Sequence, residues 1–192
     1  MDIIIASNNR HKIKEISDVF SKSINLIPMA EAGLMEDIPE NEETLEGNAL
    51  EKARYVHRMT GLNVFADDTG LEAEALNGAP GVHSARYAGE SKDSENNIIT
   101  LLKEMKGKMN NKARFRTVIA LIYENKEYLF EGIINGRIIS NKRGYNGFGY
   151  DPVFIPDNEK LTFAEMPPQR KNMISHRSMA IRKLSDFLQS RL

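Results

Sequence analysis

Two adjacent aspartates, Asp67 and Asp68, follow an apolar segment at residues 62–66 that we expect to form a buried strand. Ligand sites of open α/β sheets lie at such carboxyl ends of strands. A carboxylate there could bind Mg²⁺ or accept a proton from a water molecule. Because neighbouring strand side chains point to opposite faces, the two aspartates should have different roles. A turn that ends the strand would use the same residues.

Glu40 is a candidate partner carboxylate. It lies in an acidic run just before a predicted helix, and acidic side chains are favourable near a helix start because of the helix dipole. A solvated helix start therefore explains most of this run, and spacing alone does not single out Glu40. The run consists of Asp37, Glu40, Glu42, Glu43 and Glu46.

A polar segment between a predicted strand and a predicted helix could bind a phosphate group. Free backbone N–H groups and the helix dipole favour an anion at a helix start. The segment lacks the glycine spacing of a Walker A loop. The alternative is that Asn8 or Asn9 caps a surface helix while Lys12 stays solvated. The residues of this segment are Ser7, Asn8, Asn9, Arg10, His11 and Lys12.

Two further segments could contact a ligand. Residues 147–152 contain two glycines around Phe148, which allow close backbone approach and leave the ring free to stack on a base. A tight turn with Phe148 in the core is the alternative. Lys171 and Ser175-His176-Arg177 form a basic cluster at the start of the last predicted helix, which favours a negative or carbonyl-rich partner. Exposed surface charge would explain any one of these basic residues alone.

Short apolar runs and helical spacing predict an α/β fold with a mixed sheet. Strands are predicted at residues 3–6, 25–28, 62–66, 117–123 and 127–134, and helices at 13–20, 45–56, 98–105 and 180–188. Gly61 should end the second helix, and Ser94 and Ser175 are the expected N-caps of the last two. Asn135-Gly136 predicts either a two-residue hairpin turn or a bulge in one long bent strand.

Composition and charge exclude several classes of protein. The chain has 192 residues, for which we expect a single domain over residues 1–192. The absence of Cys excludes disulfides, thiolate zinc sites and a Cys nucleophile. With 26 Lys and Arg against 27 Asp and Glu, a nucleic-acid partner is not expected. No apolar run approaches the roughly 20 residues of a spanning helix, and the N-terminus does not resemble a signal peptide. We therefore expect no membrane partner and a cytoplasmic location.

Together, these segments resemble the inosine triphosphate pyrophosphatase (Ham1) family, whose members remove non-standard purine nucleotides. The stretch at residues 78–89 and the pairing of the motifs at 147–152 and 175–177 are highly specific, and the matches extend from residue 7 to residue 177. The matching stretches are Ser7-Asn8-Asn9 with Lys12, Phe65-Ala66-Asp67-Asp68-Thr69-Gly70-Leu71, Gly78-Ala79-Pro80-Gly81-Val82-His83-Ser84-Ala85-Arg86-Tyr87-Ala88-Gly89, Gly147-Phe148-Gly149-Tyr150-Asp151-Pro152 and Ser175-His176-Arg177.

The resemblance implies a long twisted mixed β-sheet with flanking helices, two lobes around a central cleft, and a homodimer. It implies a nucleoside-triphosphate pyrophosphatase that uses Mg²⁺ and cleanses the nucleotide pool. The substrates would be purine nucleoside triphosphates, namely ITP, dITP and XTP, which would be hydrolysed to the monophosphate and pyrophosphate.

The resemblance also assigns roles by position. Asp68 would be the catalytic carboxylate, and Glu40 and Asp68 would bind the metal. The substrate-binding residues would be Ser7, Asn8, Asn9, Arg10, His11, Lys12, Lys52, Thr69, Phe148, Gly149, Tyr150, Asp151, Lys171, His176 and Arg177. Donors from His176 or Arg177 would read the 6-oxo group of the base. Thr69 stands where Ser is more usual, and Gly47 replaces a more usual Glu, which weakens its helix by about 1 kcal/mol relative to Ala.

Three other functions compete with this interpretation. A Maf-like nucleotide pyrophosphatase would have a related two-lobed fold, but the motifs at 147–152 and 175–177 favour the first family. A nucleotide-binding sensor would bind without turnover, whereas Asp68 with Glu40 predicts a magnesium-dependent product. A purely structural domain would require five independent motif matches to be accidental.

Overall fold

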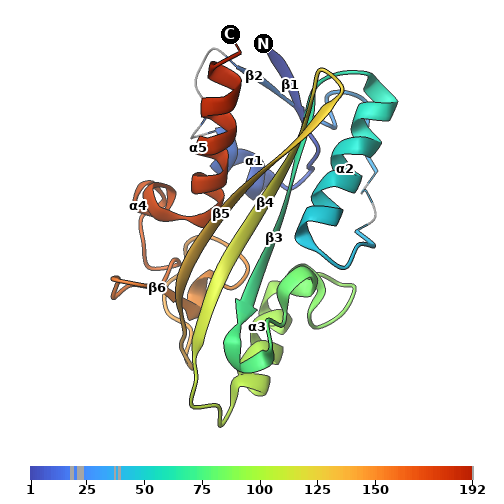
Figure 1. Ribbon diagram of the computed structural model, residues 1–192. Helices are drawn as coiled ribbons and strands as arrows, with labels where there is room; N and C mark the ends of the chain where they lie inside the picture. The colour runs from blue at the N-terminus through green and yellow to red at the C-terminus, as the bar shows by residue number, and fades with distance from the viewer. Residues whose placement is uncertain (18–19, 21–23, 37, 39, 192) are drawn as a thin grey trace. The chain divides into compact units, whose positions relative to one another are not determined.

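The computed structural model describes residues 1–17, 20, 24–36, 38 and 40–191 (Figure 1). In this part of the chain, six strands form one mixed sheet in the order β2-β1-β3-β4-β5-β6. The strands are β1 Asp2–Ile5, β2 Asn25–Pro28, β3 Val64–Ala73, β4 Lys112–Tyr123, β5 Lys126–Ile138 and β6 Phe154–Pro156. The helices are α1 Arg10–Ser17, α2 Leu45–Thr60, α3 Ser94–Met105, α4 Pro168–Ile174 and α5 His176–Gln189, with short 3₁₀ turns at Glu74–Leu76, Gly81–Arg86 and Asp151–Val153.

The chain divides into two compact units. Unit 1 contains Met1–Asp68, Thr117–Gly132 and Arg177–Leu192, and unit 2 contains Thr69–Arg116 and Ile133–His176. Strands β3, β4 and β5 each contribute residues to both units. The α/β class with a mixed sheet and flanking helices is confirmed, because β1 pairs in parallel with β2 and β3 while β5 pairs antiparallel with β6. Two lobes around a cleft and a single domain stay predictions.

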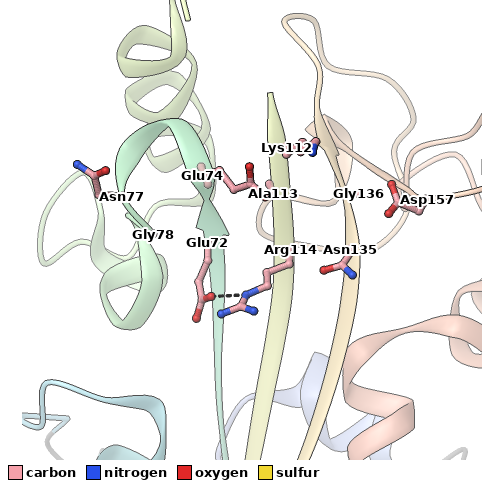
Figure 2. Close-up of a pocket in the computed structure, with 11 residues that line it drawn as sticks. Glu72, Glu74, Asn77, Gly78, Lys112, Ala113, Arg114, Asn135, Gly136 and Asp157 are labelled. Carbon is pink, nitrogen blue, oxygen red and sulfur yellow. Dashed lines mark hydrogen bonds and ion pairs between the residues drawn. The ribbon is translucent and has the colours of Figure 1, made fainter. Parts of the chain in front are cut away.

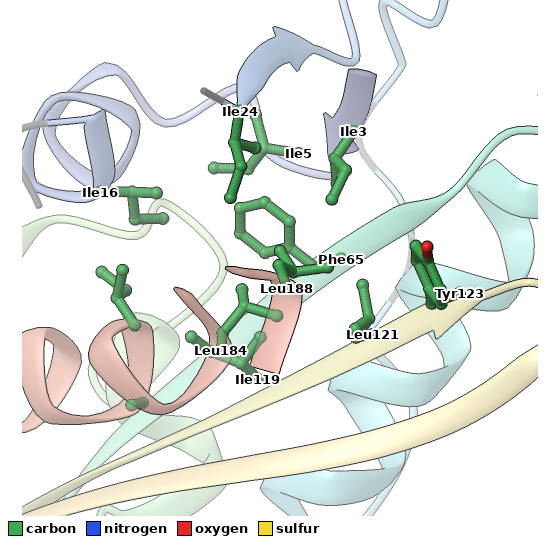
Figure 3. Packing of buried hydrophobic residues seen from close by; sticks show 12 residues of the cluster. Ile3, Ile5, Ile16, Ile24, Phe65, Ile119, Leu121, Tyr123, Leu184 and Leu188 are labelled. Atoms are coloured by element: carbon green, nitrogen blue, oxygen red, sulfur yellow. The ribbon is translucent and has the colours of Figure 1, made fainter. Parts of the chain in front are cut away.

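The core of unit 1 lies between one face of its strands and helices α1 and α5. Figure 3 shows apolar side chains converging around Phe65, with Ile5 from β1 and Leu184 from α5 among them. Alternation along β1 and β3 sends the intervening side chains to the opposite face. Helix α2 buries Ala49, Ala53 and Val56, so both faces of these strands are covered and their sequences read as continuous apolar runs.

Helix α2 has defined ends that fix its position in the chain. The Thr44 side chain accepts a hydrogen bond from the N–H of Gly47, as an N-cap does. Gly61 adopts φ 69° and its N–H bonds to the His57 carbonyl, which confirms the predicted helix end.

The core of unit 2 is aromatic. Phe115 packs edge-on against Phe154 at 4.7 Å between ring centroids, and Phe163 lies 6.0 Å from Phe115. Strand β6 pairs with β5 in the register Gly136↔Pro156 and Ile138↔Phe154. A Cβ atom at Gly136 would lie 2.3 Å from the Ile155 carbonyl oxygen, so this close approach requires glycine.

Three local predictions were wrong. The strand predicted to end at Ala66 continues to Ala73, so Asp67 and Asp68 lie inside β3 rather than at its end. It continues because Leu71 and Ala73 bury their side chains and Gly70 admits the backbone of Gly81.

The hairpin alternative for Asn135-Gly136 was also wrong, since both residues lie within β5. The N-cap of α3 is Asp93, whose carboxylate accepts the N–H of Asn96, whereas Ser94 is the first helical residue. The N-terminal helix is described only as far as Ser17, because residues 18–19 of its predicted span are outside the described residues. None of the helices in the described part of the chain is long and apolar enough to span a membrane.

Candidate active site

Asp67 and Asp68 are both buried in β3 of unit 1, and they have different partners. Asp67 Oδ2 lies 3.1 Å from Lys12 Nζ of α1 and 3.5 Å from Arg177 Nε of α5. Asp68 Oδ1 lies 3.6 Å from Lys52 Nζ of α2. The two carboxylates therefore have separate ion-pair partners, whereas their different roles stay a prediction.

The two carboxylates also differ in their electrostatics. Burial raises the pKa of Asp67, but the charges of Lys12, Arg177 and Lys52 outweigh burial and hold this pKa well below its usual range. Burial raises the pKa of Asp68 above its usual value, and Lys52 and Lys12 only partly oppose this effect. Asp67 is thus a fixed anion, whereas Asp68 is more easily protonated, as a proton acceptor in catalysis should be.

Lys52 connects Asp68 to Glu40. Its ammonium lies 2.6 Å from Glu40 Oε1 and donates a hydrogen bond of 2.8 Å to the Asp67 carbonyl. Burial lowers the pKa of Lys52, but the nearby carboxylates, Asp68 foremost, outweigh it and raise this pKa above its usual value. Two carboxylates from distant parts of the sequence therefore converge on one cation.

This donor set is compatible with Mg²⁺. Among the described residues, no group of three or more His, Cys, Asp or Glu side chains is arranged to hold a metal ion. Glu40 and Asp68 supply two carboxylates that already share a positive partner. Mg²⁺ commonly uses one or two carboxylates and takes its remaining ligands from water and substrate phosphates. The residues present therefore fit this ion.

The segment predicted to bind phosphate forms the turn between β1 and α1. Asn9 Oδ1 accepts the N–H groups of His11 at 3.0 Å and Lys12 at 3.2 Å, so Asn9 caps the helix as the alternative interpretation proposed. The other part of that alternative was wrong, because Lys12 pairs with the buried Asp67 instead of staying solvated. Ser7 Oγ accepts the N–H of Asn9. The amide of Asn8 donates to the Met35 carbonyl at 3.3 Å, and its Oδ1 is buried without a hydrogen-bond partner. Arg10 and His11 are exposed.

Arg177 is buried in unit 1, with its side chain 3% exposed. Its guanidinium pairs with Glu15 on α1 and with Asp67 on β3. Sequence reasoning did not select Glu15. The sequence contains a pattern that could have identified it, because Glu15 lies three residues after Lys12 and residues with this spacing share one face of a helix.

Unit 2 holds a second group of predicted residues. Lys171 Nζ lies 2.7 Å from Asp151 Oδ2 and 5.1 Å from the centroid of the Phe148 ring. The same carboxylate accepts the N–H of Phe148 at 2.9 Å. A Cβ atom at Gly147 would lie only 1.9 Å from Asp151 Oδ2, so this turn depends on glycine. Phe148 is half-buried.

Other predicted residues of unit 2 are placed differently. Tyr150 is 4% exposed, and its hydroxyl donates to the Ser84 carbonyl at 2.8 Å. Burial raises the pKa of Tyr150 above its usual value. His176 is buried and stacks on Phe115 at 4.6 Å. Thr69 and Gly149 are half-buried.

Asn48 is the second residue that sequence reasoning missed. It is fully buried on α2, and its amide donates to Asp68 Oδ2 at 3.1 Å. Asn48 precedes Lys52 by four residues, so the helical period places both side chains on the face that meets Asp68.

The structure thus brings together two sets of predicted residues, one in each unit. Unit 1 assembles Lys12, Glu40, Lys52, Asp67, Asp68 and Arg177, whereas unit 2 assembles Phe148, Asp151 and Lys171.

A separate pocket of about 550 Å³ lies within unit 2 and is not the predicted site (Figure 2). Arg114 Nε in this pocket pairs with Glu72 Oε2 at 2.6 Å, so these two charges neutralise each other. None of the predicted site residues belongs to the pocket lining, which is Glu72, Ala73, Glu74, Asn77, Gly78, Lys112, Ala113, Arg114, Asn135, Gly136 and Asp157.

These features define an α/β protein with a buried carboxylate and lysine centre in one unit and an aromatic, lysine-containing turn in the other. The chain belongs to the Ham1 family, whose sequence model matches residues 3–187. The predicted family resemblance is therefore confirmed.

Close relatives and a solved structure match nearly the whole chain. A dITP/XTP pyrophosphatase of Flavobacterium johnsoniae is 50% identical over 188 residues, which cover 98% of each chain. A dITP/XTP pyrophosphatase of Porphyromonas gingivalis is 52% identical and is matched over 97% of this chain and 96% of its own length. The structure of the Staphylococcus aureus Ham1 protein matches with a TM-score of 0.91 and 38% identity over 100% of both chains.

Proposed function

We propose that this chain hydrolyses non-standard purine nucleoside triphosphates, namely ITP, dITP and XTP, to the monophosphate and pyrophosphate. The proposal rests on the group formed by Asp68, Lys52 and Glu40, in which a buried carboxylate with a raised pKa lies beside a cation and a second carboxylate. The names of the two relatives, both dITP/XTP pyrophosphatases, support this substrate class. The activity would remove these nucleotides from the precursor pool.

The triphosphate would bind through Lys12, Lys52 and the start of α1. Backbone N–H groups at a helix start favour an anion, and Ser7 to Lys12 would add polar side chains there. Both lysines already neutralise carboxylates, so each is held in place before the substrate arrives. Preorganised cations of this kind stabilise the charge that develops during phosphoryl transfer.

Glu40 and Asp68 would hold Mg²⁺ together with oxygens of the substrate. When bound, the ion would supply positive charge next to the leaving pyrophosphate. Glu40 is held for this purpose by its 2.6 Å contact with Lys52.

Asp68 would accept the proton of the attacking water. The water oxygen bonds to the α-phosphorus while the bond from this phosphorus to the bridging oxygen of pyrophosphate breaks. The raised pKa of Asp68 brings its basicity closer to what proton transfer near neutral pH requires. Asp67 would not share this role, because its charge is fixed by Lys12 and Arg177.

Residues of the second motif group would recognise the base. The ring of the half-buried Phe148 would stack on the purine, beside Lys171 and Asp151. Inosine and xanthosine carry a 6-oxo acceptor, whereas adenine carries a 6-amino donor. A donor from Arg177 or His176 would be satisfied by the oxo group and left unpaired by the amino group, which gives strong discrimination.

The remaining parts of the proposal follow from the family. Thr69 and Gly149 would contact the substrate, and the protein would act as a homodimer in the cytoplasm. One domain over residues 1–192 would contain the whole site.

A product assay tests the function. The purified protein is incubated with Mg²⁺ and a panel of ITP, dITP, XTP, ATP, GTP and UTP, and pyrophosphate and orthophosphate are measured separately. We expect pyrophosphate from the first three nucleotides and its loss when EDTA removes the metal. Release of orthophosphate alone, or no turnover of ITP with Mg²⁺ present, would contradict the proposal.

A further inference from the structure

Asn48 makes two hydrogen bonds that connect separate parts of unit 1. Its Nδ2 donates to Asp68 Oδ2 at 3.1 Å, and its Oδ1 accepts the backbone N–H of Glu42 at 2.9 Å. The side chain is completely buried. Because the amide oxygen is occupied by an N–H donor, the amide NH₂ must face the Asp68 carboxylate.

The bond to Glu42 controls the segment that carries Glu40. Glu42 lies two residues after Glu40, so a fixed Glu42 backbone restrains the segment from which the Glu40 carboxylate reaches Lys52. Asn48 also lies one helical turn before Lys52, which contacts both Glu40 and Asp68. One buried amide therefore restrains the two carboxylates that meet at the same ammonium group.

Gly47 explains how the segment that contains Glu42 packs so closely against the first turn of α2. A Cβ atom at Gly47 would lie 2.7 Å from Glu42 Cβ, which is too close for any other residue without a shift of the Glu42 backbone. The glycine lowers the helix propensity of α2. It also provides the space in which Glu42 reaches Asn48.

We propose that Asn48 is a positioning residue that, with the space left by Gly47, holds Asp68 and the Glu40 segment in the arrangement that binds a divalent cation. The metal ion in this inference rests on the proposed function, whereas the hydrogen bonds of Asn48 do not depend on that function. A polar residue that orients metal-binding carboxylates typically contributes a factor of about 10 to 100 in metal affinity.

Mn²⁺ binding tests the inference independently of turnover. Mn²⁺ accepts the same oxygen ligands as Mg²⁺, and its free form is quantified by electron paramagnetic resonance. We expect Asn48→Ser in the full chain to weaken Mn²⁺ binding without nucleotide by about 10-fold or more. The kcat/KM for ITP with limiting Mg²⁺ should fall in parallel, and a high Mg²⁺ concentration should recover part of it.

Asn97 provides a matched control. It is a buried helical asparagine of unit 2 whose amide also bonds at both ends, to the Ala88 N–H and the Ala85 carbonyl. Asn97→Ser should lower the thermal stability as Asn48→Ser does, but it should leave the Mn²⁺ affinity unchanged.

Gly47→Ala tests the same geometry without removing a hydrogen-bonding group. It should weaken Mn²⁺ binding by displacing Glu42, although alanine favours the helix, and it decides the question if Asn48→Ser does not fold. The inference is overturned if the folded Asn48→Ser protein, or Gly47→Ala in its place, binds Mn²⁺ as the wild type does, or if the wild type does not bind Mn²⁺. Mn²⁺ binding that depends on Asn48 in a protein that leaves ITP intact would overturn the proposed function alone.

Discussion

Lys12 and Asp67 form an ion pair of 3.1 Å in which the aspartate side chain is only 1% exposed and the lysine side chain is 18% exposed. The pair joins α1 to β3, so the helix start proposed to bind phosphate is tied to the strand that carries Asp68. Arg177 approaches the same carboxylate oxygen from α5. Asp67 is therefore the common anchor of two cations with proposed substrate contacts.

Replacement of this anchor should destabilise the fold in a pH-dependent way. Asp67→Asn leaves Lys12 and Arg177 without their shared counter-ion, which should cost about 3 kcal/mol near neutral pH. The folded-state pKa of Asp67 lies below the unfolded value, so its stabilisation is present above an unfolded pKa of about 3.9 and is lost as pH falls through the folded value.

Urea unfolding of both proteins at about pH 7 and about pH 3 measures this effect. The difference between wild type and Asp67→Asn should shrink at the lower pH. An equal difference at both pH values would show that the charge of Asp67 is not the source of its contribution.

Replacement of Asp68 should have the opposite effect on stability from replacement of Asp67. Burial raises the pKa of Asp68, so ionising Asp68 costs more in the folded than in the unfolded chain, and the neutral amide introduced by Asp68→Asn should preserve or raise the melting temperature. Loss of the proton acceptor should lower kcat by about 100-fold or more. Calorimetry and the pyrophosphate assay together check both parts, and wild-type turnover by Asp68→Asn would remove this residue from the catalytic role.

Arg177 should affect both base choice and stability. Arg177→Ala removes a donor for the 6-oxo group and should narrow the ratio of kcat/KM between ITP and ATP. It also removes the buried guanidinium that pairs with both Glu15 and Asp67, so we expect a loss of about 3 kcal/mol in the free energy of unfolding.

Lys183→Ala is the control, because it removes an exposed cation from the same helix. It should change neither the ratio of kcat/KM between ITP and ATP nor the free energy of unfolding. The ratio is measured at a temperature where all three proteins are folded. If Arg177→Ala keeps the wild-type ratio, Arg177 does not read the base.

Tyr150 should act through the position of its loop rather than through its hydroxyl. Tyr150→Phe removes the bond to the Ser84 carbonyl, which should cost about 1 kcal/mol of stability. Because Phe148 lies in the same loop, the KM for ITP should rise while kcat changes little. Tyr145→Phe serves as the control, since the Tyr145 side chain is fully exposed. A fall in kcat with unchanged KM would contradict this role.

The sequence alone determined the family, the α/β class and most of the candidate residues. Apolar runs such as Ile3-Ile4-Ile5 and the helix end at Gly61 depend on neighbouring residues, so local patterns predict them. The separation of Asp67 from Asp68 was also predictable, because alternation along a strand is a local property.

Only the tertiary structure decided which partner each charged residue has. The continuation of β3 beyond Asp68 depends on burial of Leu71 and Ala73, and burial is set by packing against distant segments. The pairing of Arg177 with Glu15 joins residues 162 positions apart, and no local pattern encodes such a contact. Only folding brings the Asn48 amide on α2 within hydrogen-bonding distance of Asp68 on β3. A buried amide is stable there only when both its oxygen and its nitrogen have hydrogen-bond partners.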